Sequence, residues 1–237
     1  MKTRSCWGYP PSRIYRFINS YGNMFDKVCV IGCSDGKFVF PFLRKGYDVT
    51  AIDMDVESLY GGFKEKPIDR PKSAITKQNY RLSKDKLIYK KLPVESVKIM
   101  GLAERAKIEK LETKLHIICG DAYHNVIGSK YDVVFTSCSL QYKSNRDLKL
   151  KEIMLRLKSY VNPGGFLYMD YMMPLEDSHE WKSELFFRTG TIKTFFDINW
   201  EIVHLYEMRK PVFEAAHIDR PEDHFHRFGY ILARKIS

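Results

Sequence analysis

The sequence predicts an α/β protein built on a doubly wound, mostly parallel sheet with an antiparallel strand pair near its C-terminal end. Through most of the chain, short apolar runs alternate with segments of helical periodicity. The last third instead holds two apolar runs with only a loop between them. A length of 237 residues fits a single domain that covers residues 1–237.

The first predicted unit is a strand, a helix and a second strand. Residues 27–32 form an apolar run that ends at a glycine, and residues 48–53 form a second run that ends at an acid. Between them, Phe38, Val39 and Phe42 recur at helical spacing. A connection of this kind makes the two strands parallel.

The remaining elements follow from the same two periodicities. Val97, Leu102 and Ala106 recur among charged residues and indicate a helix, and an Asn-Pro-Gly-Gly turn begins at Asn162. The predicted helices cover residues 94–110 and 146–160, and the predicted strands cover residues 115–121, 131–137, 166–170, 200–206 and 227–233.

Positive charge is concentrated in one segment. The chain has 39 Lys and Arg against 29 Asp and Glu, a formal net charge of +10, and residues 64–91 alone carry +7 of it. We interpret residues 60–93 as a basic insertion that is an RNA-binding appendage, a lid over an anionic small substrate, or a solvated extension. Its few aromatic residues favour the lid or the extension over RNA binding.

Other features narrow the class of protein. No stretch approaches eighteen apolar residues, so no membrane-spanning helix is expected and no membrane partner. Residues 1–19 lack the apolar core of a signal peptide, and residues 1–25 are expected to form an N-terminal lid segment. Five cysteines without a C-x-x-C pair predict reduced thiols in a cytoplasmic protein.

A candidate nucleotide site lies between the first predicted strand and helix. Gly32-Cys33-Ser34-Asp35-Gly36 offers small residues and unpaired backbone N–H groups. An acid 21 residues after the first glycine ends the next strand, where it can accept both hydroxyls of a ribose. The loop lacks the G-x-G-x-x-G pattern of dinucleotide sites.

Five segments in order resemble the motifs of class I S-adenosylmethionine-dependent methyltransferases. They are residues 30–36, 46–53, 119–122, 131–142 and 161–168. The ending, from residue 187 to residue 235, is similar to the small-molecule branch that includes tellurite-resistance-type enzymes. The resemblance implies a Rossmann-like fold, S-adenosylmethionine as cofactor and S-adenosylhomocysteine as product.

The resemblance also implies roles for individual residues. Val30 stands where the family usually has an acid, and Ser34 where it usually has a glycine, and these departures leave room for a modified cofactor or an altered pose. The implied cofactor-binding residues are Gly32, Cys33, Ser34, Asp35, Gly36, Asp53, Met54, Asp121, Ala122, Ser137 and Cys138.

Methyl transfer needs alignment more than it needs protein chemistry, and a base helps when the acceptor must lose a proton. His217, His224 and His226 are the candidates for that base. The loop that carries them is interpreted as a substrate-binding or base-supplying loop, with an ordinary surface loop and a metal site through His224-x-His226 as alternatives. No residue is assigned as a metal ligand.

Candidate substrate-binding residues follow strand ends or lie near the N-terminus. They are Trp7, Tyr9, Tyr142, Tyr171 and Arg227, and plain packing is an alternative of equal weight for Tyr142 and Tyr171. Gln141-Tyr142 departs from the motif of amine-modifying nucleic-acid methyltransferases.

The expected function is methyl transfer from S-adenosylmethionine to an oxygen or nitrogen of a small polar or anionic metabolite. The alternatives are an RNA (tRNA) methyltransferase that uses the basic insertion, and a non-catalytic cofactor-binding protein. The sequence does not fix the acceptor or the oligomeric state.

Overall fold

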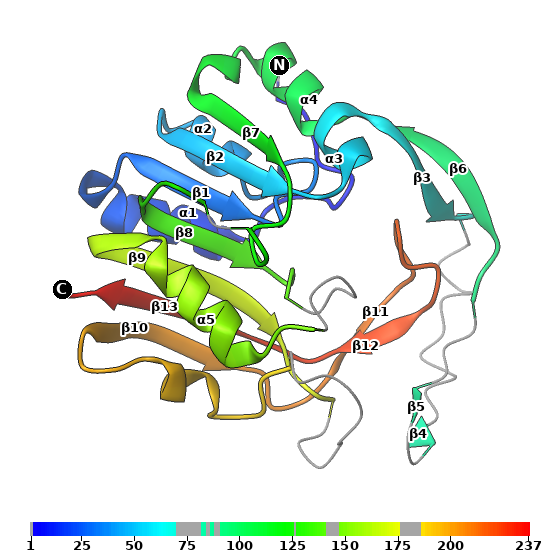
Figure 1. Cartoon of the computed structure of the whole chain (residues 1–237). Helices are drawn as coiled ribbons and strands as arrows, with labels where there is room; N and C mark the ends of the chain where they lie inside the picture. Colours follow the sequence, from blue (N-terminus) through cyan, green and yellow to red (C-terminus); the bar gives the residue numbers. More distant parts are fainter. Residues whose placement is uncertain are drawn as a thin grey trace.

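The protein forms one central sheet with helices on both faces (Figure 1). The computed structural model describes residues 2–69, 82–83, 86–87, 91–125, 127–140, 147–175 and 186–237. Within these ranges no helix is long and apolar enough to cross a membrane.

The seven strands of the main sheet run in the order β10-β13-β9-β8-β1-β2-β7. From β9 through β8, β1 and β2 to β7, each strand is parallel to its neighbour, whereas β13 is antiparallel to both β9 and β10. This topology confirms the predicted fold class, including the antiparallel C-terminal pair. The strands are β1 Lys27–Ile31, β2 Asp48–Asp53, β7 Leu115–Cys119, β8 Tyr131–Ser137, β9 Val161–Met172, β10 Trp200–Glu207 and β13 Phe228–Lys235.

Alternating side chains of the central strands supply two cores, one on each face of the sheet. Val28 and Val30 pack with residues of α1, α2 and α4, while Cys29 and Ile31 pack with residues of α5. Val30 therefore belongs to the core. The helices are α1 Ser12–Tyr21, α2 Phe40–Leu43, α3 Val56–Tyr60, α4 Leu102–Glu109 and α5 Leu150–Ser159, with 3₁₀ turns at Gly22–Met24, Glu112–Lys114 and Ile192–Phe195.

The basic insertion begins and ends in a β-hairpin. Strand β3, Gly62–Pro67, pairs antiparallel with β6, Val94–Ile99. The prediction of one helix over residues 94–110 is wrong in its first half, because only α4 is helical. Gly101 separates the two parts: a Cβ there would lie 2.1 Å from the backbone nitrogen of Gly61, so the chain crosses itself too closely for a side chain.

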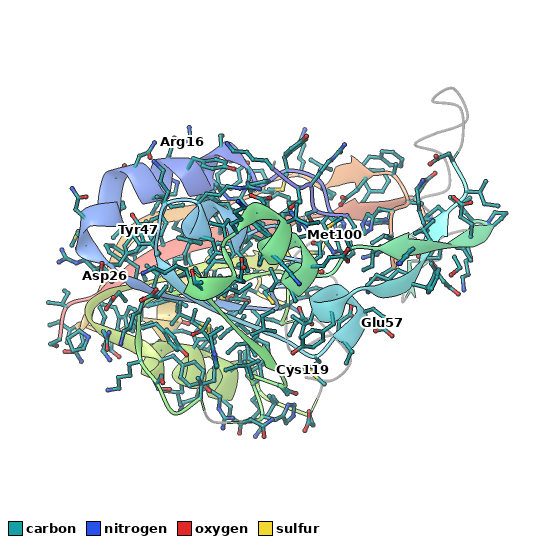
Figure 2. All side chains as sticks on the ribbon, turned by 90° about the horizontal axis from the view of Figure 1, so that it is seen from above. Arg16, Asp26, Tyr47, Glu57, Met100 and Cys119 are labelled. Atoms are coloured by element: carbon teal, nitrogen blue, oxygen red, sulfur yellow. The ribbon has the colours of Figure 1, made fainter. Side chains whose placement is uncertain are left out.

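The hairpin extends away from the sheet, with Met100 and Glu57 near its base (Figure 2). Two short strands, β4 Leu82–Ser83 and β5 Lys86–Leu87, pair within the insertion. The predicted loop between the last two strands also contains a small sheet, because β11, Val212–Glu214, pairs with β12, His224–His226. Figure 1 shows this small sheet on the same side of the molecule as the hairpin.

Candidate active site

The loop after β1 makes a tight turn at the carboxyl end of the parallel strands. Gly32, Ser34 and Gly36 all have positive φ, at 67°, 48° and 92°. A Cβ on Gly32 would lie 2.4 Å from the Cβ of Ser139, so the position admits only glycine. The backbone nitrogens of Gly32 and Cys33 donate to the Ile52 carbonyl at 2.8 and 3.1 Å, which ties the loop to β2.

Asp53, at the end of β2, is held by this loop. Its Oδ2 accepts the N–H of Ser34 at 2.6 Å and its Oδ1 accepts the N–H of Asp55 at 2.9 Å. Burial raises the pKa of Asp53, and the backbone hydrogen bonds oppose that shift. Each carboxylate oxygen keeps a further lone pair, so the group can still accept from a ligand. Met54 follows it with an exposed side chain.

Asp35 and Cys33 face the protein, which limits what they offer a ligand. The carboxylate of Asp35 is buried, accepts from the Ser5 hydroxyl at 2.5 Å and from the Cys6 N–H at 2.7 Å, and pairs with Arg105 at 3.3 Å. The Cys33 thiol lies in the core, where burial raises its pKa. Both residues contribute to the loop through their backbone.

The N-terminal segment lies against the loop of residues 32–36. The indole N–H of Trp7 donates to the Ser34 hydroxyl at 2.8 Å, and Asp35 anchors the preceding residues. Tyr9 is exposed, with the Arg4 guanidinium 4.9 Å from its ring centre. Trp7 is thus positioned at the loop and Tyr9 is directed to solvent.

After the end of β7, Asp121, a predicted cofactor residue, lies beside His124, which the sequence analysis missed. Asp121 accepts the N–H of Tyr123 at 2.8 Å, and its Oδ2 lies 2.7 Å from Nδ1 of His124. Nε2 of His124 lies 3.0 Å from the Asp147 carboxylate. The hydrogen bond to Asp147, and after it the one to Asp121, raises the pKa of His124. The three-residue spacing of Asp121 and His124 was the available signal. Ala122, beside them, is buried.

The ends of β8 and β9 form a second polar centre. The Ser137 hydroxyl donates to Asp170 at 2.9 Å, and the Arg13 guanidinium pairs with the same carboxylate at 2.6 Å. Asp170 is buried, and burial raises its pKa. Its Oδ1 has no hydrogen-bond partner among the residues that the structure describes. Cys138 has a φ of 50°, and burial raises the pKa of its thiol to about 12, so the thiol is neutral.

Asp170 and Arg13 are functional candidates that sequence reasoning did not select. Asp170 was visible as the acid that ends the run of residues 166–170. Arg13 offered no signal, because it lies 157 residues from its partner. Lys37 belongs to the same neighbourhood, since it interacts electrostatically with Arg13, Cys138 and Asp170, and burial lowers its pKa.

The three predicted histidines lie together, and Glu214 joins them. The register of the small sheet pairs Glu214 with His224, and Nε2 of His226 lies 2.7 Å from the Glu214 carboxylate. The ring of His217 meets the ring of Trp7 edge-on, with centroids 5.3 Å apart. Because Trp7 also contacts Ser34, it connects the histidine cluster to the loop of residues 32–36.

The insertion also borders this region. The Lys64 ammonium pairs with Asp55, which follows β2, and with Asp219 in the histidine loop at 2.6 Å. The N–H of Leu92 donates to the Pro221 carbonyl at 2.8 Å. These contacts connect the insertion to the loop of residues 217–226 and to the residues that follow β2.

Two of the candidate substrate residues, Tyr171 and Arg227, are buried. Tyr171 is fully buried against Phe187, and its hydroxyl donates to Glu207 at 3.0 Å, which favours the packing alternative for this residue. Arg227 donates to the carbonyls of Met208 and Pro174 and so connects two loops. Their substrate roles stay predictions. Tyr142 lies outside the described residues.

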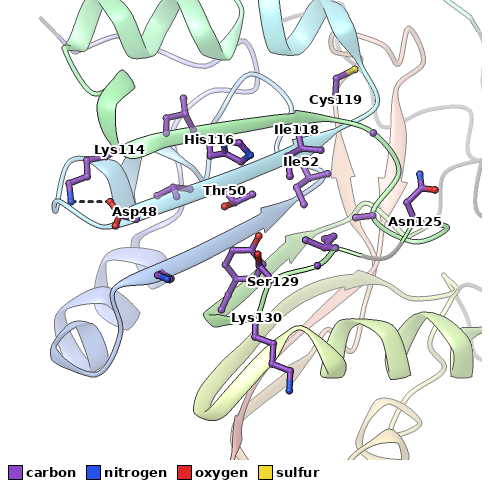
Figure 3. A pocket seen from close by; sticks show the side chains of 18 of the residues that line it. Asp48, Thr50, Ile52, Lys114, His116, Ile118, Cys119, Asn125, Ser129 and Lys130 are labelled. Carbon is purple, nitrogen blue, oxygen red and sulfur yellow. Dashed lines mark ion pairs between the residues drawn. The ribbon is translucent and has the colours of Figure 1, made fainter.

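A groove of about 830 Å³ opens on the sheet face beside β7 (Figure 3). Residues 120–130 connect β7 to β8 without a helix among the described positions, which leaves that face uncovered. Asp121 and Ala122 line the groove, whereas the loop of residues 32–36 does not. Of the candidate cofactor-binding residues, therefore, only Asp121 and Ala122 border the groove.

Comparison with known proteins supports the fold. No protein-family model and no curated protein matches the chain. Among solved structures, TehB from Haemophilus influenzae is similar, with a TM-score of 0.58 and 15% identity over 95% of this chain, which spans 62% of the length of TehB. A putative RNA methyltransferase from Pyrococcus horikoshii has a TM-score of 0.53 and 13% identity, over 100% of this chain and 93% of that one.

A third similar structure contains the expected cofactor. Magnesium protoporphyrin IX methyltransferase from Synechocystis, with bound S-adenosylmethionine, has a TM-score of 0.51 and 13% identity over 94% of this chain and 77% of that one. At these identities the likeness concerns the fold. The chain has the Rossmann-like fold of S-adenosylmethionine-dependent methyltransferases, as its motifs predicted.

Proposed function

We propose that the protein is an S-adenosylmethionine-dependent methyltransferase that acts on an oxygen or nitrogen of a small polar or anionic acceptor. The observation that carries this proposal is the loop after β1, which is closed onto Asp53 by the Ser34 N–H. It stands at the carboxyl edge of the parallel strands, in a fold similar to that of S-adenosylmethionine-dependent methyltransferases. Bound S-adenosylmethionine would supply the reactive methyl group on its sulfonium.

The residues present fit such a cofactor. Gly32 lets the loop turn closely past Ser139, and Asp53 with exposed Met54 offers a ribose acceptor next to an apolar surface. The buried Oδ1 of Asp170, which has no hydrogen-bond partner among the described residues, can accept from the cofactor's methionine amine. Asp170 would then supply the acid that is missing at Val30.

Positive charge near this second polar centre supports an anionic acceptor. Arg13 and Lys37 both interact with Asp170, and a carboxylate acceptor would relieve the half-buried ammonium of Lys37. The protein's task is then to align the acceptor with the methyl group and exclude water, which can contribute on the order of 7–11 kcal/mol.

A labelled-methyl assay tests the function. Purified protein, incubated with isotopically labelled cofactor and a metabolite panel, is expected to give one product heavier by a single labelled methyl. A larger transferred group would contradict methyl transfer. Binding of S-adenosylhomocysteine without transfer to any acceptor class, RNA included, would support the non-catalytic alternative.

Replacement of Asp53 tests the cofactor site itself. Asp53→Ala is expected to weaken S-adenosylhomocysteine binding by at least about 10-fold, the equivalent of ~1.4 kcal/mol. Asp48→Ala is a matched control, because Asp48 lies at the other end of the same strand and pairs with Lys114 at the surface. Equal affinity in the two variants would refute the ribose role.

An RNA acceptor is the second candidate, on the basis of the +7 charge of residues 64–91. It requires tRNA binding that weakens steeply with salt, because each neutralised phosphate releases a counterion. Weak, salt-independent binding would remove this candidate and leave the small-molecule proposal intact.

A further inference from the structure

Four side chains on the small sheet point potential ligand atoms at one another. They are Glu214 of β11, His224 and His226 of β12, and His217 between the two strands. One ligand atom from each lies within 4.8 Å of the other three. Sequence alone suggested the pair in β12, and strand pairing adds the carboxylate.

Backbone carbonyls fix how two of the histidines present their rings. Nδ1 of His217 lies 2.8 Å from the Ile218 carbonyl, and Nδ1 of His224 lies 2.6 Å from the Glu222 carbonyl. A carbonyl only accepts, so Nδ1 carries the hydrogen in both rings and a neutral ring directs the Nε2 lone pair into the cluster. Metal-binding histidines are commonly oriented in this way.

The third histidine cannot satisfy its neighbours with one proton. Its Nε2 lies 2.6 Å from Nε2 of His224 and 2.7 Å from the Glu214 carboxylate, and both of those atoms are acceptors. Nδ1 of His226 is buried without a hydrogen-bond partner among the described residues. A cation at the centre would satisfy all of the converging lone pairs, because it needs no directional hydrogen.

We propose that Glu214, His217, His224 and His226 bind one Zn²⁺ ion. Three imidazoles and a carboxylate are the ligands of a borderline cation, whereas Mg²⁺ and Ca²⁺ prefer oxygen throughout. The shortest distances between ligand atoms of the cluster, from 2.6 to 3.8 Å, bracket those of a tetrahedral site with bonds of about 2.0–2.1 Å.

The proposed ion would lie where it could bind the methyl acceptor. His217 contacts Trp7, which hydrogen-bonds the cofactor loop at Ser34. If the proposed methyl transfer is correct, an acceptor oxygen or nitrogen that displaces half-exposed Glu214 would bind the ion and lose its proton more readily. The zinc site itself does not depend on that function.

Metal analysis of the full chain, purified without a His tag, tests the proposal. After chelation and reloading with Zn²⁺, about one ion per chain is expected, and Co²⁺ in its place should give the visible absorption of a tetrahedral site. Glu214→Gln and His226→Gln should each lower Zn²⁺ affinity by at least about 100-fold, more than the loss of an outer hydrogen-bond partner does. His116→Gln, an exposed histidine on β7, should leave it unchanged.

Circular dichroism establishes that each variant is folded. If His226→Gln does not fold, Glu214→Gln still tests the site, because the Glu214 side chain is half-exposed and its replacement disturbs packing less. Substoichiometric zinc in the wild-type protein, or equal affinity in folded Glu214→Gln, would overturn the proposal. Titration of the metal-free protein with S-adenosylhomocysteine separates the two ideas, because cofactor binding without zinc binding would refute only the metal site.

Discussion

Removal of the Asp35 carboxylate should destabilise the protein strongly, because it would strand a buried cation. The Asp35 and Arg105 side chains are 1% and 3% exposed and lie 3.3 Å apart. Breaking a buried pair by removing one partner costs about 3–5 kcal/mol. Asp35→Ala also removes the acceptor for Ser5 and Cys6, so the N-terminal segment loses its anchor.

Thermal unfolding provides the measurement. For a chain of this length, each kcal/mol shifts Tm by roughly 2–4 °C, so Asp35→Ala should lower Tm by roughly 6–20 °C. Asp48→Ala, which breaks only a surface pair, should change stability by about 0.5 kcal/mol or less. The double variant Asp35→Ala/Arg105→Met should cost less than the sum of the two single variants by at least about 1 kcal/mol. A Tm of Asp35→Ala within about 2 °C of the wild type would refute the reasoning.

Two further predictions concern pH and backbone geometry. Burial raises the pKa of Glu109, but hydrogen bonds from Arg44 and Thr3 outweigh it and lower this pKa from its ordinary 4.5 to about 2. The ionised carboxylate therefore contributes roughly 3 kcal/mol of stability at most, which is present above pH 4.5 and lost as pH falls toward 2. Urea unfolding should show the wild type converging on Glu109→Gln across that window, and a constant difference would contradict it. Gly32→Ala should destabilise the protein by at least about 1 kcal/mol and weaken S-adenosylhomocysteine binding, because φ at this position is positive and the new Cβ would meet Ser139. Gly128→Ala is the control and should have neither effect, because a Cβ there meets open space. Equal Tm values for the two variants would contradict this prediction.

Most of the main sheet could be predicted from local sequence. Its strands are short apolar runs with clear glycine turns, so pattern and position agreed. Residues 94–99 were misjudged because the spacing of Val94 and Val97 fits a helix, whereas only Val97 and Ile99 have the spacing of a strand. The partner strand β3, some thirty residues earlier in the chain, decided between them.

The site was predictable only where chemistry follows a strand end. Asp53 and Asp121 could be predicted in this way. The role of Asp35 could not, because it depends on Ser5 and Arg105, which are 30 and 70 residues away in the sequence. Glu214 likewise joins the histidines through the register of two short strands. Distant partners of this kind leave no trace in local periodicity.

Calorimetric titration of the wild-type protein with S-adenosylhomocysteine tests the central claim most directly. The loop after β1, Asp53 and Asp170 predict saturable binding at one site per chain, with a Kd well below about 1 mM. Absence of binding up to that concentration would contradict the assignment of this loop as a cofactor site, and with it the proposed methyl transfer.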